Sequence, residues 1–274
     1  MSEQSSNSDG QAAKAKAGAT AAEIQRSAIS DGLELVTVAS RPMVTLGFSY
    51  SSPADPVASV ILIEGGPGNP AFDLDRTDGR SSGGDGFLVK SEGFFRDEGF
   101  AVTLMRAPSD QGEKMAGAFR NGTEHVRDAE AVIDFLKSQS SARVWLVGMS
   151  LGSGSAGNIV VNSSKIDGGA VFVSSVSDEG EHGVTPARFR AMHNIVHPVL
   201  AVAHEKDACP SARPECANDI IAKCEKAPAK EIKLFSGGLN QGEHPCRPLT
   251  YHTYFGIEQE VAHYISGFIK ANSQ

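Results

Sequence analysis

The feature that most constrains the fold is a series of short, continuous apolar runs that alternate with segments of helical periodicity. Runs of this length bounded by Gly and Pro are typical of strands buried on both faces. They occupy residues 58–64, 100–105, 143–147, 169–174, 198–203 and 231–235, preceded by an alternating strand at 44–50. Helical patterns cover residues 123–137, 151–161, 218–226 and 257–268. The sequence therefore predicts an α/β fold, with a mostly parallel central sheet flanked by helices on both faces.

Length and composition favour one folded domain. The chain has 274 residues, of which 40% are hydrophobic and 21% charged, as in an ordinary globular protein. Residues 1–30 are polar and rich in Ser, Ala and Lys, so we expect a flexible tail followed by a single α/β domain at residues 31–274.

Charge and hydropathy exclude some partners. The formal net charge of -8 and the lack of a Lys/Arg cluster argue against nucleic-acid binding. No apolar run reaches the ~18 residues needed to span a bilayer, so no membrane span is expected. Residues 1–30 hold no apolar leader, which predicts a cytoplasmic protein; a periplasmic or secreted location is the alternative.

A strand, a sharp turn and a helix surround Ser150. Gly148-Met149-Ser150-Leu151-Gly152 fits the G-x-S-x-G pattern of a nucleophile elbow. Glycines flank the serine because Cβ atoms there would collide with neighbouring backbone. The sequence therefore predicts Ser150 as a nucleophile, and the N–H of Leu151 as a donor to a developing oxyanion.

A rival pattern overlaps this one. Residues 152–157 spell G-x-G-x-x-G, with Asp178 about twenty residues on, as in a dinucleotide-binding fingerprint. Such a fingerprint normally follows the first strand, whereas several strands precede this one. Close packing of small helix residues on the sheet is the purely structural alternative.

A serine hydroxyl needs a base, and the base needs an acid to fix its tautomer. His252 follows the last strand and precedes the closing helix, so it is the expected base, with His244 as the alternative. Asp207 follows the strand at 198–203 and is the expected acid, with Asp178 as the alternative.

The second oxyanion donor should come from the turn after the first buried central strand. Glu64-Gly65-Gly66-Pro67-Gly68 supplies backbone N–H groups there. Gly66 is the expected donor and Gly65 the alternative, and an ordinary tight turn would explain the same residues.

Four cysteines lie in the last third of the chain: Cys209, Cys216, Cys224 and Cys246. They allow three disulfide connectivities, and four reduced thiols fit the sequence equally well. Their spacings match no common zinc module, so no metal site is expected.

Four segments together resemble a group of poorly characterised bacterial α/β-hydrolases, many of them exported. They are GGDGFLVKSEGFFRDEGFAVTLMRAPSD, VWLVGMSLGS, PVLAVAHEKDAC and the PC-x5-HTYFGIE segment. The resemblance implies an α/β-hydrolase fold with Ser150, Asp207 and His252 as its triad. It also suggests that Cys209 and Cys246 lie near the catalytic loops, where they could be bridged.

The segment between the strands at 169–174 and 198–203 leaves room for only a short lid, with a short helix at 185–193. An open site would suit small esters, so we expect a carboxylic-ester hydrolase that forms an acyl-enzyme and needs no cofactor. Thioesterase, lactonase and peptidase activities use the same triad. A binding module without turnover and a dinucleotide-binding protein are the alternatives of another class. The oligomeric state stays open.

Overall fold

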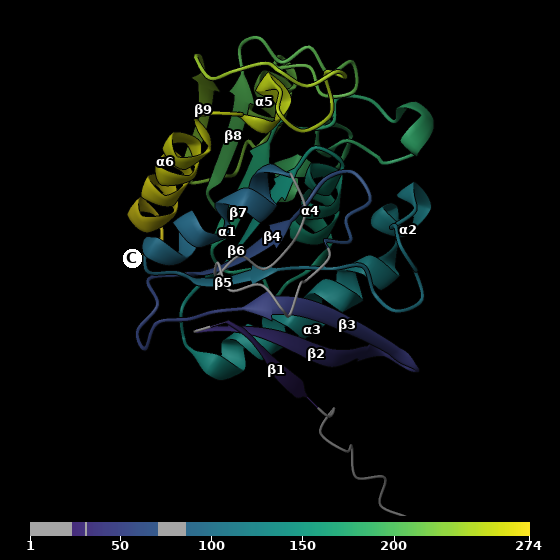
Figure 1. Ribbon diagram of the computed structural model, residues 1–274, viewed down its shortest axis with the longest axis vertical. Helices are drawn as coiled ribbons and strands as arrows, with labels where there is room; N and C mark the ends of the chain where they lie inside the picture. The colour runs from purple at the N-terminus through teal and green to yellow at the C-terminus, as the bar shows by residue number, and fades with distance from the viewer. Residues whose placement is uncertain (1–23, 31, 71–85) are drawn as a thin grey trace, which may run out of the picture.

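A parallel sheet forms the centre of the protein, shown as a computed structural model in Figure 1. The structure describes residues 24–30, 32–70 and 86–274. In these residues a six-stranded sheet has the order β5-β4-β6-β7-β8-β9, and a three-stranded sheet has the order β1-β2-β3. The strands are β1 (Gln25–Ser30), β2 (Leu33–Arg41), β3 (Val44–Tyr50), β4 (Ser59–Ile63), β5 (Ala101–Leu104), β6 (Val144–Met149), β7 (Gly169–Val173), β8 (Val199–His204) and β9 (Lys230–Phe235).

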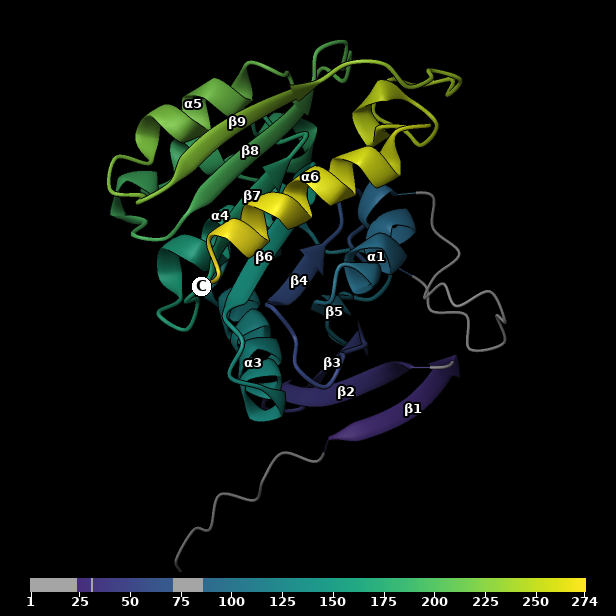
Figure 2. The same ribbon diagram turned by 90° about the vertical axis from the view of Figure 1, so that its left-hand side faces the viewer.

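Helices cover both faces of the parallel sheet. α1 (Phe87–Asp97) and α6 (Glu258–Ala271) pack side by side on one face, where Figure 2 shows α6 crossing the strands. α3 (Thr123–Gln139), α4 (Leu151–Asn162) and α5 (Cys216–Lys223) cover the other face, and the short α2 (Gly117–Asn121) packs on α3 and α4.

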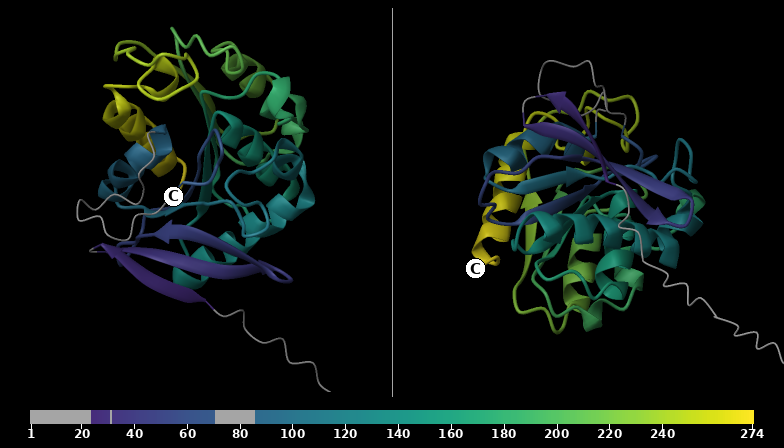
Figure 3. Two further views of the ribbon diagram at one scale, coloured as in Figure 1. Left: turned by 45° about the vertical axis from the view of Figure 1, so that its right-hand side comes forward. Right: turned by 90° about the horizontal axis from the view of Figure 1, so that it is seen from below.

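All pairings in the six-stranded sheet are parallel, as the alternation of apolar runs and helices predicts. The pairings β1–β2 and β2–β3 are antiparallel. Isolated bridges Phe48–Met105 and Ser51–Val102 join β3 to β5, so the small sheet continues one end of the large one (Figure 3).

The parallel sheet separates two apolar cores. Alternate residues of each strand face opposite sides, because successive side chains of a strand point to opposite faces. Trp145 on β6 is fully buried in the core beneath α6. Its ring meets Phe268 edge-on at 6.0 Å between centroids, and its indole N–H donates to the Ser273 hydroxyl at 2.9 Å. The C-terminal helix is thus fixed to the centre of the sheet.

The predicted fold class and mostly parallel sheet are confirmed, and every predicted strand is present within two residues of its expected bounds. The boundary at residue 30 is wrong, because Gln25–Ser30 forms β1. That strand is held by main-chain pairing with β2, which requires little apolar sequence. Residues 71–85, whose Asp, Ser and Gly content predicts a long surface loop, lie outside the described residues.

The helix expected at 185–193 is also wrong. Short 3₁₀ turns stand there instead, at Ala187–Phe189 and Met192–Asn194. The backbone is extended at Pro186, before the first turn, and again at Arg190, between the two turns, so a continuous helix does not form over 185–193. No helix in the described part of the chain is long and apolar enough to cross a bilayer.

Candidate active site

Ser150 sits at a strained turn between β6 and α4. Its backbone has φ 51° and ψ -124°, a conformation that non-glycine residues rarely adopt. The neighbouring glycines make the turn possible: a Cβ on Gly148 would lie 2.5 Å from the Gly152 oxygen, and one on Gly152 would lie 2.1 Å from the Ile63 oxygen. The clash predicted from the sequence is therefore present, and it fixes Ser150 above the end of the sheet.

His252 and Asp207 form a buried pair. Nδ1 of His252 lies 2.7 Å from Oδ2 of Asp207, with side-chain exposures of 2% and 1%. An ionised carboxylate only accepts hydrogen bonds, so Nδ1–H is the donor in this contact. The other carboxylate oxygen of Asp207 accepts the N–H of Cys209 at 2.9 Å. In the neutral imidazole this arrangement leaves Nε2 as a hydrogen-bond acceptor.

β7 brings the serine turn close to the His252 loop. The N–H of Ser150 donates to the Val173 oxygen at 3.0 Å, and the hydroxyl of Ser174, the next residue, lies 3.0 Å from the His252 oxygen. Ser150 and Asp207 follow β6 and β8, which flank β7 in the sheet. Ser150 makes no hydrogen bond with His252 in the part of the chain that the structure describes.

Buried aromatic and polar groups support the His252 turn. The ring of His204 stacks on Tyr251 at 4.5 Å, while its Nε2–H donates to the Gly237 oxygen at 3.0 Å. Tyr254 is fully buried, and its hydroxyl lies 2.9 Å from the Ser174 hydroxyl. Burial raises the pKa of Tyr254, so the phenol stays neutral. These contacts restrict the loop on both sides of His252.

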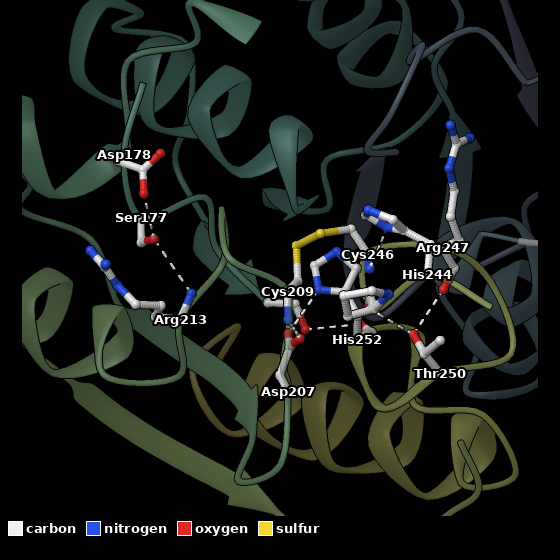
Figure 4. Close-up of a disulfide and its surroundings, with 12 residues drawn as sticks. Ser177, Asp178, Asp207, Cys209, Arg213, His244, Cys246, Arg247, Thr250 and His252 are labelled. Atoms are coloured by element: carbon white, nitrogen blue, oxygen red, sulfur yellow. Dashed lines mark hydrogen bonds and ion pairs between the residues drawn. A yellow bond between two sulfur atoms is a disulfide. The ribbon is translucent and has the colours of Figure 1, made fainter. Parts of the chain in front are cut away.

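A disulfide joins the loop that bears Asp207 to the loop that leads to His252. Cys209 bonds to Cys246, with sulfurs 2.04 Å apart (Figure 4). Cys209 lies two residues after Asp207, and Cys246 lies six residues before His252. Cys216 and Cys224 are free and buried. The bridge that the family resemblance suggested is present.

The backbone N–H groups of Leu151 and Gly66, the expected oxyanion donors, have no acceptor within the described residues, whereas the N–H of the alternative, Gly65, has one. Leu151 is the first residue of α4, where a helix N–H has no intrahelical acceptor. Gly66 is exposed and, among the described residues, its N–H meets no acceptor. The N–H of Gly65 instead donates to Oε1 of Glu64 at 2.8 Å, which removes Gly65 as a donor. A Cβ on Gly65 would lie 2.8 Å from the Ser150 Cβ, so this turn directly adjoins the serine.

Two charged residues lie beside this turn. Glu64 directly precedes it in the sequence, whereas Arg120 reaches it from α2 and had no signal in the sequence. Burial raises the pKa of Glu64, opposed by hydrogen bonds from three backbone N–H groups and by the charge of His252. Burial lowers the pKa of Arg120 to about 10, opposed by the charge of Glu64. Glu64 is thus within electrostatic reach of both Arg120 and His252.

The alternative residues lie elsewhere. His244 is exposed, and its Nδ1 accepts the Cys246 N–H at 3.3 Å. Asp178 meets the Ser177 hydroxyl at 3.4 Å and points away from His252 in Figure 4. Within the described residues no group of three or more His, Cys, Asp or Glu side chains could hold a metal ion.

The glycines of the rival dinucleotide pattern pack against protein. Gly154 and Gly157 lie inside α4, where a Cβ on the first would meet Val184 at 2.4 Å and one on the second would meet Ala187 at 3.0 Å. A phosphate-binding loop would instead present its glycines to open space before a helix. The small residues of α4 therefore serve close packing in this structure.

Comparisons with known proteins identify the fold. Neither a protein-family model nor a curated protein sequence matches the chain. An esterase from Pyrococcus furiosus is 12% identical over 92% of both chains, with a TM-score of 0.61. A dienelactone hydrolase from Anabaena variabilis is 14% identical over 92% of this chain and 99% of its own, with a TM-score of 0.60. A monoacylglycerol lipase from Paleococcus ferrophilus is 16% identical over 83% of this chain and 99% of its own, with a TM-score of 0.54. With its parallel sheet, its strained serine turn and these structural relatives, the chain has the α/β-hydrolase fold.

Proposed function

We propose that the protein is a serine hydrolase that cleaves carboxylic esters through an acyl-enzyme on Ser150. The observation that carries the proposal is the buried 2.7 Å contact between His252 Nδ1 and Asp207 Oδ2, joined through β7 to the strained Ser150 turn. The structural relatives include proteins described as an esterase, a dienelactone hydrolase and a monoacylglycerol lipase. A serine, an imidazole and a carboxylate in this order are the machinery of acyl transfer.

The proposed reaction has two halves. Ser150 Oγ attacks the ester carbonyl while His252 Nε2 takes its proton, and the N–H groups of Leu151 and Gly66 stabilise the oxyanion. The tetrahedral intermediate collapses, and His252 returns the proton to the leaving alcohol. Water, deprotonated by His252, then attacks the acyl-enzyme and releases the acid. No metal or organic cofactor enters these steps.

Small esters are the proposed substrates. Between β7 and β8 the chain forms only short 3₁₀ turns, at Gly180–His182, Ala187–Phe189 and Met192–Asn194. A connection this short favours an accessible site over one enclosed by a large cap. Thioesters, lactones and amides react through the same intermediate and are the competing substrates.

Labelling with a fluorophosphonate tests the proposal. Intact mass and peptide mapping should place one adduct on Ser150, and p-nitrophenyl acetate or butyrate should be hydrolysed. Ser150→Ala should lose both responses while keeping the circular dichroism of the wild type. Neither labelling nor turnover in the wild type would favour a binding module without catalysis; stabilisation by NAD(H) or NADP(H) would favour the dinucleotide hypothesis.

We also propose that the protein works in an oxidising compartment. Disulfides persist in such compartments and are usually reduced in the cytosol. The Cys209–Cys246 bridge favours the periplasmic or secreted alternative over the cytoplasmic one. Protein should be purified from its native cells under alkylating conditions, so that free thiols are modified. Two cysteines per chain should then be alkylated, and the other two should remain joined in a disulfide. Complete alkylation of all cysteines would oppose this location.

A further inference from the structure

The turn at residues 65–68, which we call the oxyanion turn, is held by two charged side chains, the half-buried Glu64 and the fully buried Arg120. Glu64 accepts the Gly65 N–H through Oε1 at 2.8 Å, and Arg120 donates from Nη2 to the Gly66 oxygen at 3.0 Å. The two oppositely charged side chains therefore hold the peptides on either side of the Gly65–Gly66 peptide.

These contacts determine where the Gly66 N–H points. The Gly65 oxygen accepts the Gly68 N–H at 3.0 Å. In a trans peptide the C=O and the following N–H point in opposite directions, so this bond turns the Gly66 N–H outward. Arg120 fixes the next peptide through the Gly66 oxygen, and Glu64 fixes the preceding one through the Gly65 N–H. Gly66 has φ 52° and needs such restraint, since glycine is otherwise free to rotate.

Each charged side chain is anchored away from the turn. Oε2 of Glu64 accepts the N–H groups of Leu88 and Val89, at 2.9 and 3.1 Å, at the start of α1. Nη1 of Arg120 donates to the Ser155 hydroxyl of α4 at 3.0 Å. The turn is thereby tied to a helix on each face of the sheet.

Space around the turn is filled as well. Arg120 is fully buried, and a Cβ on Gly68 would lie 2.1 Å from its Nη2. Burying a guanidinium costs free energy of folding unless its hydrogen bonds and charge are compensated. In the described part of the chain Nε of Arg120 has no hydrogen-bond partner. A buried charge held at this cost beside the nucleophile is typical of a functional site.

We propose that Glu64 and Arg120 are positioning residues, which hold the Gly66 N–H in place to stabilise the oxyanion. Neither touches the substrate in this proposal; both act through the backbone of the oxyanion turn. The proposal rests on the proposed ester hydrolysis at Ser150.

Glu64→Gln is a sharp test, because a carboxylate accepts on both oxygens whereas an amide accepts on only one. Gly65 donates to Oε1, and Leu88 and Val89 donate to Oε2. The NH2 group of Gln must therefore face either the Gly65 N–H or the N–H groups of Leu88 and Val89, and that contact is lost. The variant is nearly isosteric, so any loss arises from the broken contact.

Arg120→Met removes the bond to Gly66, and Arg120→Lys keeps the charge if the Met variant fails to fold. Matched controls are Arg190→Met and Asp128→Asn. Arg190 binds Asn121 and Asn158, and burial lowers its pKa to about 10. Asp128 is fully buried and pairs with Arg41 at 2.8 Å.

The experiment measures kcat and KM for p-nitrophenyl butyrate, the inhibition constant of a trifluoromethyl ketone, and melting by circular dichroism. The ketone forms a hemiketal whose oxyanion occupies the same donors as the transition state. For the Glu64 and Arg120 variants we expect kcat to fall roughly 10- to 10³-fold, as when an oxyanion donor is lost, with little change in KM. Ketone affinity should fall in proportion to kcat/KM. The control variants should melt at a lower temperature but keep the wild-type kcat and the wild-type inhibition constant of the ketone.

Folded Glu64→Gln or Arg120→Met protein with wild-type kcat and ketone affinity would overturn the positioning role. Equal losses in the two controls would overturn it too, because they would indicate a general effect of core damage. A wild type that shows neither turnover nor Ser150 labelling would instead refute the proposed function itself, before any variant is compared.

Discussion

Removal of the Cys209–Cys246 bridge should lower both stability and activity. The bond closes a loop between residues 37 positions apart. In the chain-entropy treatment, a loop of this length restricts the unfolded chain by about 4 kcal/mol at 25 °C. A domain of this size loses roughly 2–4 °C of Tm per kcal/mol, so Cys209→Ala/Cys246→Ala should melt on the order of 10 °C lower.

The activity should fall for a separate reason. The bridge connects the segment after Asp207 to the segment before His252, so its loss lets the Asp207 and His252 loops move apart. A displacement of about 1 Å at a reacting group can cost on the order of 10²-fold in rate. We therefore expect a lower kcat for p-nitrophenyl butyrate at temperatures where the double variant is fully folded.

Urea unfolding followed by circular dichroism, with and without a phosphine reductant, measures the first effect. Reduction should shift the wild type to the midpoint of the double variant and leave the double variant unchanged. Cys216→Ala/Cys224→Ala is the control, because it keeps the bridge; burial raises the pKa of both thiols to about 11, which makes them poor nucleophiles. Identical urea midpoints for wild type and Cys209→Ala/Cys246→Ala would refute the reasoning.

Three further predictions concern single residues. Burial, with nearby arginines, lowers the pKa of His125 to about 3, and both of its ring nitrogens lack partners within the described residues. Between pH 6.5 and 3 the unfolded chain therefore binds a proton at His125 that the folded chain does not bind. The free energy of unfolding should fall over this range by at most about 1.4 kcal/mol per pH unit. His125→Phe should reduce this decline, as measured by urea unfolding at a series of acid pH values. Asp207→Asn should lower kcat by orders of magnitude through a wrong His252 tautomer, whereas Asp178→Asn should stay near the wild-type value; the reverse ranking in ester assays would move the acid to Asp178. Gly65→Ala should abolish fluorophosphonate labelling while the protein stays folded, since its Cβ would lie 2.8 Å from the Ser150 Cβ; normal labelling would contradict the observed packing.

The central strands were predictable because apolar runs report burial on both faces. β4 and β6 consist entirely of buried residues, and their sequences contain almost no polar side chain. β1 lacked this signal, since four of its six residues are exposed and its pairing is through the main chain. A pattern of side chains cannot reveal a strand whose side chains are mostly in solvent.

The proposed triad could be chosen from the sequence because each residue follows a recognisable strand. Ser150 follows β6 directly, and Asp207 follows β8 by a short turn. Arg120 could not be found this way, because it comes from the five-residue helix α2 and reaches Gly66 only through the folding of distant segments. Contacts made by a single long side chain leave no periodicity in the sequence.

Trp145 has a practical consequence for every variant discussed above. It is the single tryptophan of the chain, and it lies on the strand that ends at the Ser150 turn. Its emission therefore comes from one known place, between the sheet and the C-terminal helix. A red shift would report water entering that layer, whereas an inactive variant with unchanged emission would have lost only local geometry at the other end of the strand. The fold thus contains its own optical marker, which separates damage to the scaffold from damage to the site.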